Sequence, residues 1–103
     1  MDVGYAIREI RQKQDLTQAQ LAERCCMSTN AVSALEIGKT FPPRSTVERV
    51  CRALGVPVAY LLMASIQEVD FPDDKRILYR TQLEPLRNEL LTKTEDGRQS
   101  DKI

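Results

Sequence analysis

The sequence predicts an all-α fold of five short helices followed by a C-terminal helical extension. Apolar residues recur at intervals of three and four along most of the chain, which is the period of an amphipathic helix. Capping residues and glycines stand at the edges of these segments, where helices start and end. The alternating pattern of a β-strand rises nowhere above background. With 103 residues, the chain is long enough for one domain.

The first two helices are indicated by their apolar spacing and by their starts. The first is expected over residues 3–13, where apolar residues are spaced i, i+3, i+4 and i+7 and Asp2 can cap the start. The second is expected from Thr17 to about Arg24. Thr17 and Gln20 have the spacing of a capping box, in which the threonine oxygen accepts a backbone N–H and the glutamine side chain reaches back.

The third helix is expected to begin at Ser28, a good N-cap, and to end at Gly38, which can adopt a left-handed conformation. Val32 and Leu35 point to one side of this helix. The other side, an arc of roughly 140° at 3.6 residues per turn, carries Thr29, Asn30, Ser33, Ala34 and Ile37. Because the turn before this helix is so short, the second and third helices must cross at a steep angle.

Two more helices follow a loop that contains two prolines. The fourth is expected over residues 44–54, where the i, i+3, i+4, i+7 spacing returns, Cys51 joins the buried stripe and Gly55 ends the helix. The fifth is expected over residues 58–64 and is apolar on most sides, as a buried helix or a subunit contact would be. These five helices form the first predicted domain, residues 1–65.

Residues 66–91 are predicted to form a helical extension, and residues 92–103 a polar, disordered tail. Proline costs about 3 kcal/mol in a helix interior, so Pro85 predicts a break or kink near residues 83–84. Apolar residues of the extension alternate spacings of four and three, a heptad-like pattern. A dimer contact explains this pattern, and so does a segment that folds back on its own domain; we favour the dimer. The pattern consists of Tyr79, Leu83, Leu86 and Leu90.

Two capped helices joined by a three-residue turn, the second with a polar outer face, form a helix-turn-helix. This motif presents its second helix to the major groove of DNA. Asn30 can pair with adenine, whereas Ala34 and Ile37 offer apolar contact to a thymine methyl group. Because the predicted arc carries no Arg or Lys, we expect readout biased to A·T pairs, with much of the affinity coming from phosphates.

Three motifs stand in order between residues 3 and 63: LTQ.QLA opens the second helix, S…VS.LE.GKT runs through the third, and RALGVP closes the fourth. Together they resemble the five-helix, lambda-repressor-like DNA-binding domain of phage repressors and Cro, the XRE family. The resemblance implies that Gln18 binds a phosphate and that an ion pair of Arg11 with Glu36 ties the first helix to the third. It implies backbone contacts by Lys39, Thr40 and Arg44. It gives the base-facing positions to Thr29, Asn30 and Ala34, with Ser33 and Ile37 on the same face.

The sequence departs from the family pattern in the turns. Cys26 stands where the family usually has glycine, and a left-handed conformation there costs a non-glycine residue roughly 1 kcal/mol. Asp15 also replaces a common glycine, but Asp tolerates that conformation. Ile37 takes a position that is often polar in the family.

The composition argues against an enzyme, a metal site or a cofactor. The sequence has no His, which removes the commonest general base and metal ligand. Its three cysteines lack a C-x-x-C spacing and are expected to be reduced, and inert cysteines are favoured over a redox sensor at Cys25 and Cys26. The longest nearly apolar run, residues 56–66, is too short to cross a membrane, and no secretory signal is visible, so a cytoplasmic protein is expected.

We therefore expect a sequence-specific DNA-binding transcriptional regulator that acts as a homodimer on a palindromic operator. Two alternatives use the same fold. A protein-interaction adaptor that has lost DNA binding is suggested by the zero net charge and by the lack of basic residues on the third helix. An antitoxin would bind DNA and also hold a protein partner through residues 66–91.

Overall fold

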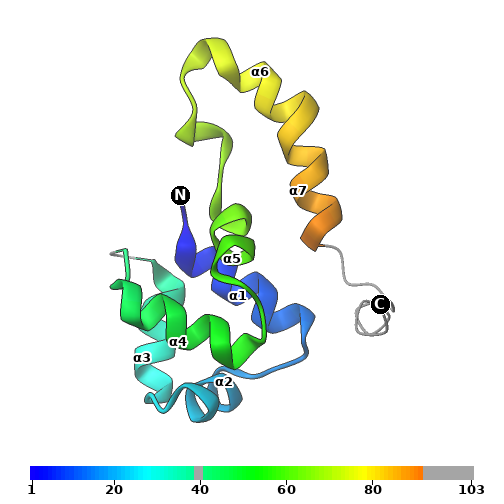
Figure 1. The fold of residues 1–103 in the computed structure, drawn as a ribbon. Coiled ribbons are helices and arrows are strands. Elements are labelled where there is room, and N and C mark those ends of the chain that lie inside the picture. The colour runs from blue at the N-terminus through cyan, green and yellow to red at the C-terminus, as the bar shows by residue number, and fades with distance from the viewer. Residues whose placement is uncertain (39–40, 92–103) are drawn as a thin grey trace.

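The computed structural model describes residues 1–38 and 41–91, and within these ranges it consists of helices, turns and loops without a strand. The predicted all-α fold is confirmed. Five helices form the compact part of the molecule (Figure 1): α1 (Val3–Lys13), α2 (Gln18–Cys25), α3 (Thr29–Ile37), α4 (Arg44–Leu54) and α5 (Val58–Ser65). The extension begins with two 3₁₀ turns, η1 (Glu68–Asp70) and η2 (Asp73–Lys75). It continues as one curved helix that consists of α6 (Arg76–Leu78), η3 (Tyr79–Leu83) and α7 (Glu84–Leu91).

The helix ends follow from local side-chain chemistry. In the capping box of α2, Thr17 Oγ1 accepts the Gln20 N–H at 3.0 Å and Gln20 Oε1 accepts the Thr17 N–H at 2.8 Å. Ser28 Oγ accepts the Ala31 N–H at 3.0 Å at the start of α3. Gly38 ends α3 in the left-handed region, with φ of 76°. These ends leave only a short turn between α2 and α3, so the two helices cross.

The core is aliphatic, with α1 at its centre. This helix contacts α3, α4 and α5, while α2 packs against α3 and α4. Burial of apolar side chains supplies most of the stabilisation of such a fold. The cysteine predicted to belong to the core, Cys51, is buried. The largest fully buried side chains are Ile7, Leu21, Leu61, Val32, Val50, Cys25 and Ser65.

Gly4 allows α1 to approach the end of α3 closely. A Cβ atom built on Gly4 would lie 2.2 Å from the Leu35 carbonyl oxygen and 3.0 Å from that of Glu36. Both are backbone atoms that cannot rotate away. A side chain at this position would therefore push α3 off α1.

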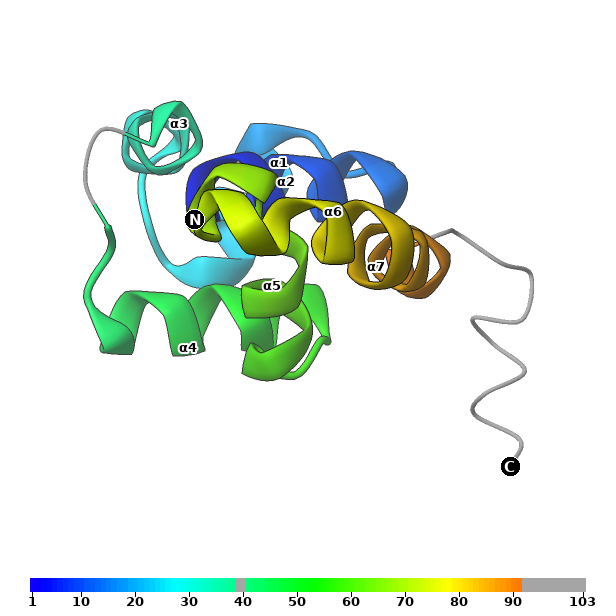
Figure 2. The ribbon, with the colours of Figure 1, turned by 90° about the horizontal axis from the view of Figure 1, so that it is seen from above.

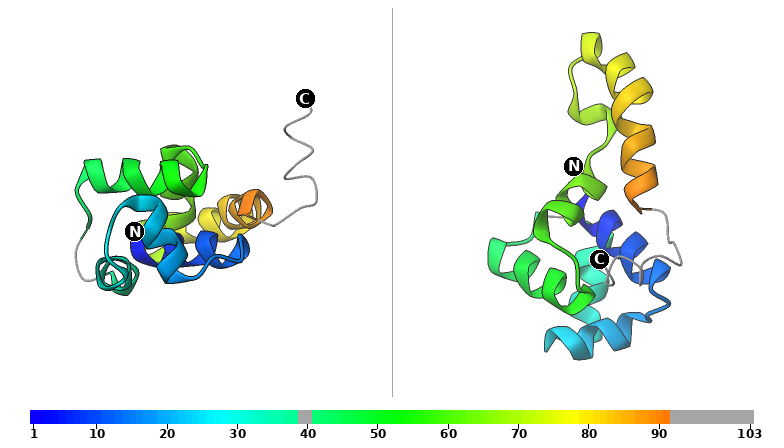
Figure 3. Two further views of the ribbon diagram at one scale, coloured as in Figure 1. Left: turned by 90° about the horizontal axis from the view of Figure 1, so that it is seen from below. Right: turned by 45° about the vertical axis from the view of Figure 1, so that its right-hand side comes forward.

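The extension leaves the domain beyond α5, arches away from it and returns along its side (Figures 1 and 3). The sequence predicts a break or kink near residues 83–84. The helix does not break there, but it changes between Leu83 and Glu84 from a π-helical turn to an α-helix. Pro85 lacks an N–H, and the irregularity takes the form of a π-helical turn, η3, at whose end the Glu84 N–H bonds to the Tyr79 carbonyl five residues earlier. The predicted tail, residues 92–103, lies outside the described residues.

In the described ranges, no helix is long and apolar enough to cross a membrane.

Candidate nucleic-acid interface

Helix α3 lies at the edge of the five-helix part, and in both Figures 1 and 2 it is on the opposite side of the molecule from α7. Thr29, Asn30, Ala34 and Ile37 are exposed along its outer face, and Ser33 is half-buried. The opposite side of α3 is fixed by Val32, which has no exposed surface. The structure thus brings the five predicted base-facing residues together on one surface.

A buried ion pair anchors the C-terminal end of α3. Arg11 Nε donates to Glu36 Oε2 at 2.6 Å, and Arg11 Nη2 donates to Glu36 Oε1 at 3.1 Å. The two side chains are only 9% and 4% exposed. Arg11 Nη1 also donates to the Leu16 carbonyl at 2.7 Å. One guanidinium therefore joins α1, the turn before α2, and the end of α3.

Gln18 completes this anchor from the first turn of α2. Its Nε2 donates to Glu36 Oε1 at 2.9 Å, so the side chain is half-buried and held against α3. The sequence suggested a phosphate contact for Gln18, whereas its tie to Glu36 had no local signal. An amide nitrogen carries two hydrogens, so this bond leaves the second one for another acceptor.

The remaining predicted phosphate contacts lie at and before the start of α4. The Arg44 side chain is 90% exposed, and its Nε donates to Glu48 Oε2 at 2.9 Å. Such an exposed pair is worth at most about 1 kcal/mol, so Arg44 can leave Glu48 for another anion at little cost. Lys39 and Thr40 lie outside the described residues.

The two turn positions that depart from the family pattern are left-handed. Cys26 has φ of 56° and ψ of 45° and ends α2, and Asp15 has φ of 59°. Cys26 is exposed while its neighbour Cys25 is buried, and burial raises the pKa of the Cys25 thiol. A buried thiol with a raised pKa is a poor nucleophile, which fits the prediction of an inert cysteine at this position.

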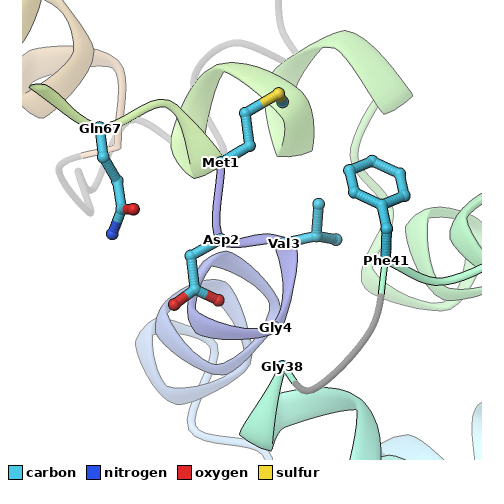
Figure 4. Close-up of a pocket in the computed structure, with 7 residues that line it drawn as sticks. All are labelled: Met1, Asp2, Val3, Gly4, Gly38, Phe41 and Gln67. Carbon is cyan, nitrogen blue, oxygen red and sulfur yellow. The ribbon is translucent and has the colours of Figure 1, made fainter. Parts of the chain in front are cut away.

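A hollow of about 240 Å³ lies between the start of α1 and the residues that flank the loop after α3 (Figure 4). Among the described residues that line it, Asp2 is the one with a charged side chain. Its Oδ1 accepts the Tyr5 N–H at 2.9 Å, so this carboxylate caps α1. Across residues 1–38 and 41–91, His, Cys, Asp and Glu side chains nowhere form a group that could hold a metal ion.

A family model described as a helix-turn-helix domain matches residues 2–61 of this chain. The chain belongs to the helix-turn-helix family. The matched region contains α1 to α4 and the first half of α5, and it includes the exposed face of α3, the ion pair of Arg11 with Glu36, Gln18 and Arg44. The resemblance to phage repressors is confirmed, and the matched region is a regulatory DNA-binding domain rather than an enzyme.

Among the proteins similar to this chain are two phage repressors and a bridging factor. The immunity repressor protein of Bacillus phage phi105 is 39% identical over 62 residues, which are 60% of this chain and 43% of the relative. The cryptic phage CTXphi transcriptional repressor RstR of Vibrio cholerae is 34% identical over 64 residues, 62% of this chain and 58% of that protein. Multiprotein-bridging factor 1 of Debaryomyces hansenii is 38% identical over 56 residues, 54% of this chain and 37% of the relative. The chain thus spans less than two thirds of each of these relatives. No solved structure matches it significantly.

Proposed function

We propose that this chain is a sequence-specific DNA-binding transcriptional regulator that acts in the cytoplasm as a homodimer on a palindromic operator. The observation that carries the proposal is the exposed face of α3, held rigidly by the buried pair of Arg11 and Glu36 and by Gln18. A helix fixed in this way can enter a major groove without ordering itself on binding. The repressors among the relatives support the regulatory role.

Sequence would be read by few side chains. Asn30 has the amide needed for a bidentate contact with adenine, and Thr29 offers a hydroxyl and a methyl group. Ala34 and Ile37 present apolar surface to thymine methyl groups, and Ser33 stands beside them. None of these five residues is charged, so the preferred sites are rich in A·T pairs.

Affinity would come chiefly from the phosphates. Arg44 is exposed and loosely paired with Glu48, and the free hydrogen of the Gln18 amide lies at the start of α2. Lys39 and Thr40, between α3 and α4 in the sequence, are proposed as further backbone contacts. These contacts fix the register of α3 and carry no sequence information themselves.

Two variants distinguish contacts to bases from contacts to phosphates, and two more serve as controls. Asn30→Ala should lower the ratio of specific to non-specific affinity by about 5- to 150-fold, equivalent to roughly 1–3 kcal/mol. Arg44→Ala should weaken binding to all duplexes and reduce the slope of log affinity against log salt by about 1. Gln12→Ala on α1 and Arg52→Ala at the far end of α4 are exposed controls that should change neither quantity. If the controls weaken binding as much as Asn30→Ala and Arg44→Ala, another surface binds the DNA.

A second candidate is a protein-interaction adaptor, favoured by the similarity to a relative named multiprotein-bridging factor 1. An adaptor would capture its partner protein equally well with Gln18→Ala or Arg44→Ala. Loss of duplex binding by these two variants, without loss of any protein partner, favours the regulator.

A further inference from the structure

One side of the extension helix already has a partner in its own chain. Tyr79 is buried, and its ring lies 5.2 Å from that of Phe71. Arg87 Nη1 donates to the Ala64 carbonyl at 3.2 Å, and the Tyr60 hydroxyl donates to the Leu90 carbonyl at 2.8 Å. These contacts fix the course of η3 and α7 beside α5. Part of the heptad-like pattern, Tyr79 above all, therefore serves the fold of the single chain.

The other side of the same helix carries an apolar stripe without a partner in the described residues. Leu78 is 53% exposed, Leu86 51% and Leu90 44%. Gln82 is exposed and continues the regular spacing of four between these leucines. We call Leu78, Gln82, Leu86 and Leu90 the outer stripe. Residues four apart are neighbours on the surface of a helix, and the outer stripe runs from the end of α6 through η3 and along α7.

The first half of the outer stripe borders a hollow. Its volume is about 280 Å³, and its accessible lining is apolar. The residues around it are Phe71, Lys75, Leu78, Tyr79, Gln82 and Leu83. The second half of the stripe ends in two exposed leucines, Leu86 and Leu90. The stripe is thus concave at its start and carries projecting side chains at its end.

We propose that a second copy of this chain packs antiparallel on the outer stripe, with the two-fold axis beside Gln82. This inference rests on the homodimer of the proposed function and specifies its interface. An antiparallel two-fold brings the end of each stripe to the start of the other, so each Leu86 enters the hollow of the other copy. Leu78 and Leu86 lie four residues on either side of Gln82, so Leu86 of each copy meets Leu78 of the other. The same contact therefore occurs twice, as an isologous interface requires.

Charge favours the same direction. Lys75 and Glu89 are exposed and lie seven residues on either side of Gln82. In the antiparallel pair, each Lys75 comes near Glu89 and near the negative end of α7 in the other copy. A parallel pair would set Lys75 against Lys75 and Glu89 against Glu89. The helix that carries the stripe lies away from α3 (Figure 1), so both α3 helices of such a dimer remain free to face DNA.

Sedimentation equilibrium of the full chain tests the surface. We expect a dimer for the wild type and a monomer for Leu86→Glu. Ile77→Glu is the matched control, since Ile77 is 63% exposed on the same helix but lies off the stripe, and it should leave the dimer intact. A wild-type monomer at tens of micromolar, a dimer that survives Leu86→Glu, or an equal loss in Ile77→Glu would overturn the proposal. Helical content from circular dichroism checks that each variant is folded.

Cross-linking tests the direction, in a Cys26→Ser background that removes the exposed thiol. Gln82→Cys lies beside the proposed axis and should form a covalent dimer on mild oxidation. Leu90→Cys should not cross-link with itself, but it should cross-link with Lys75→Cys when the two variants are mixed. Efficient self-cross-linking of Leu90→Cys would mean a parallel pair. These outcomes are independent of DNA binding, so a monomer that still selects a half-site refutes the interface and leaves the DNA-binding role standing.

Discussion

Glu36→Ala should destabilise the domain strongly, because it removes one partner of a buried ion pair. Glu36 accepts hydrogen bonds from Arg11 Nε, Arg11 Nη2 and Gln18 Nε2 at 2.6, 3.1 and 2.9 Å. Without it, a guanidinium whose side chain is 9% exposed keeps only its bond to the Leu16 carbonyl. Removing one partner of a buried pair costs about 3–5 kcal/mol. For a chain of this size, each kcal/mol lowers Tm by about 4–8 °C, so the loss should exceed about 12 °C.

Urea denaturation followed by circular dichroism measures this free energy, with Glu48→Ala as the matched control. Glu48 also accepts a hydrogen bond from an arginine Nε, at 2.9 Å, but the Arg44 side chain is 90% exposed, so its loss should cost less than about 1 kcal/mol. The double variant Arg11→Met, Glu36→Leu should recover much of the stability, since no charge is left buried. Equal losses in Glu36→Ala and Glu48→Ala would refute the claim that burial makes the inner pair important.

Three further predictions follow from the backbone and the cysteines. Cys26→Gly should raise the free energy of unfolding by about 1 kcal/mol, because φ is 56° there, whereas Cys26→Ala should change it little; urea denaturation of both variants checks this. Gly4→Ala should lower the free energy of unfolding by about 3 kcal/mol, since its Cβ would lie 2.2 Å from the Leu35 carbonyl oxygen. Gly55→Ala should lower it by only about 1 kcal/mol, because Gly55 is left-handed but has open space around it. Similar losses in the two variants would contradict the close approach of α1 and α3. Iodoacetamide should label Cys26 in the native protein well before Cys25 and Cys51, because burial raises the thiol pKa of the latter two. Mass spectrometry identifies the labelled cysteine, and early labelling of Cys25 would contradict this prediction.

The parts of the fold that sequence predicts well are those decided by neighbours along the chain. Thr17 and Gln20 form the capping box because both partners lie within one helical turn. Cys51 follows the apolar spacing of its own helix into the core. The left-handed conformation of Cys26 was also accessible from sequence, because the family pattern places glycine in that turn.

Contacts between elements distant in sequence escaped prediction from local pattern. Gly4 gave no signal, since its importance depends on how closely α1 crosses α3. The bond from Gln18 to Glu36 likewise joins two helices and has no local signature, whereas the pair of Arg11 and Glu36 was implied only by family resemblance. Pro85 indicated an irregular helix, but the sequence did not show whether the helix would break or only distort. In the structure a π-helical turn accommodates the proline and the helix continues.

The heptad-like pattern of the extension shows a further limit of sequence reasoning. Apolar spacing indicates that a helix face is buried, but it does not indicate whether the surface that covers this face belongs to the same chain. Tyr79 packs against its own chain, whereas Leu86 and Leu90 remain exposed. Separating these two faces required the orientation of η3 and α7 relative to α5.

Selection of bound duplexes from a random pool, at two salt concentrations, shows whether the exposed face of α3 reads DNA sequence. We expect recovery of an inverted repeat rich in A·T pairs, with half-sites about one helical turn apart, and weaker binding at the higher salt. Binding without enrichment of any sequence would contradict specific readout by α3. No binding at either salt would contradict the DNA-binding role itself.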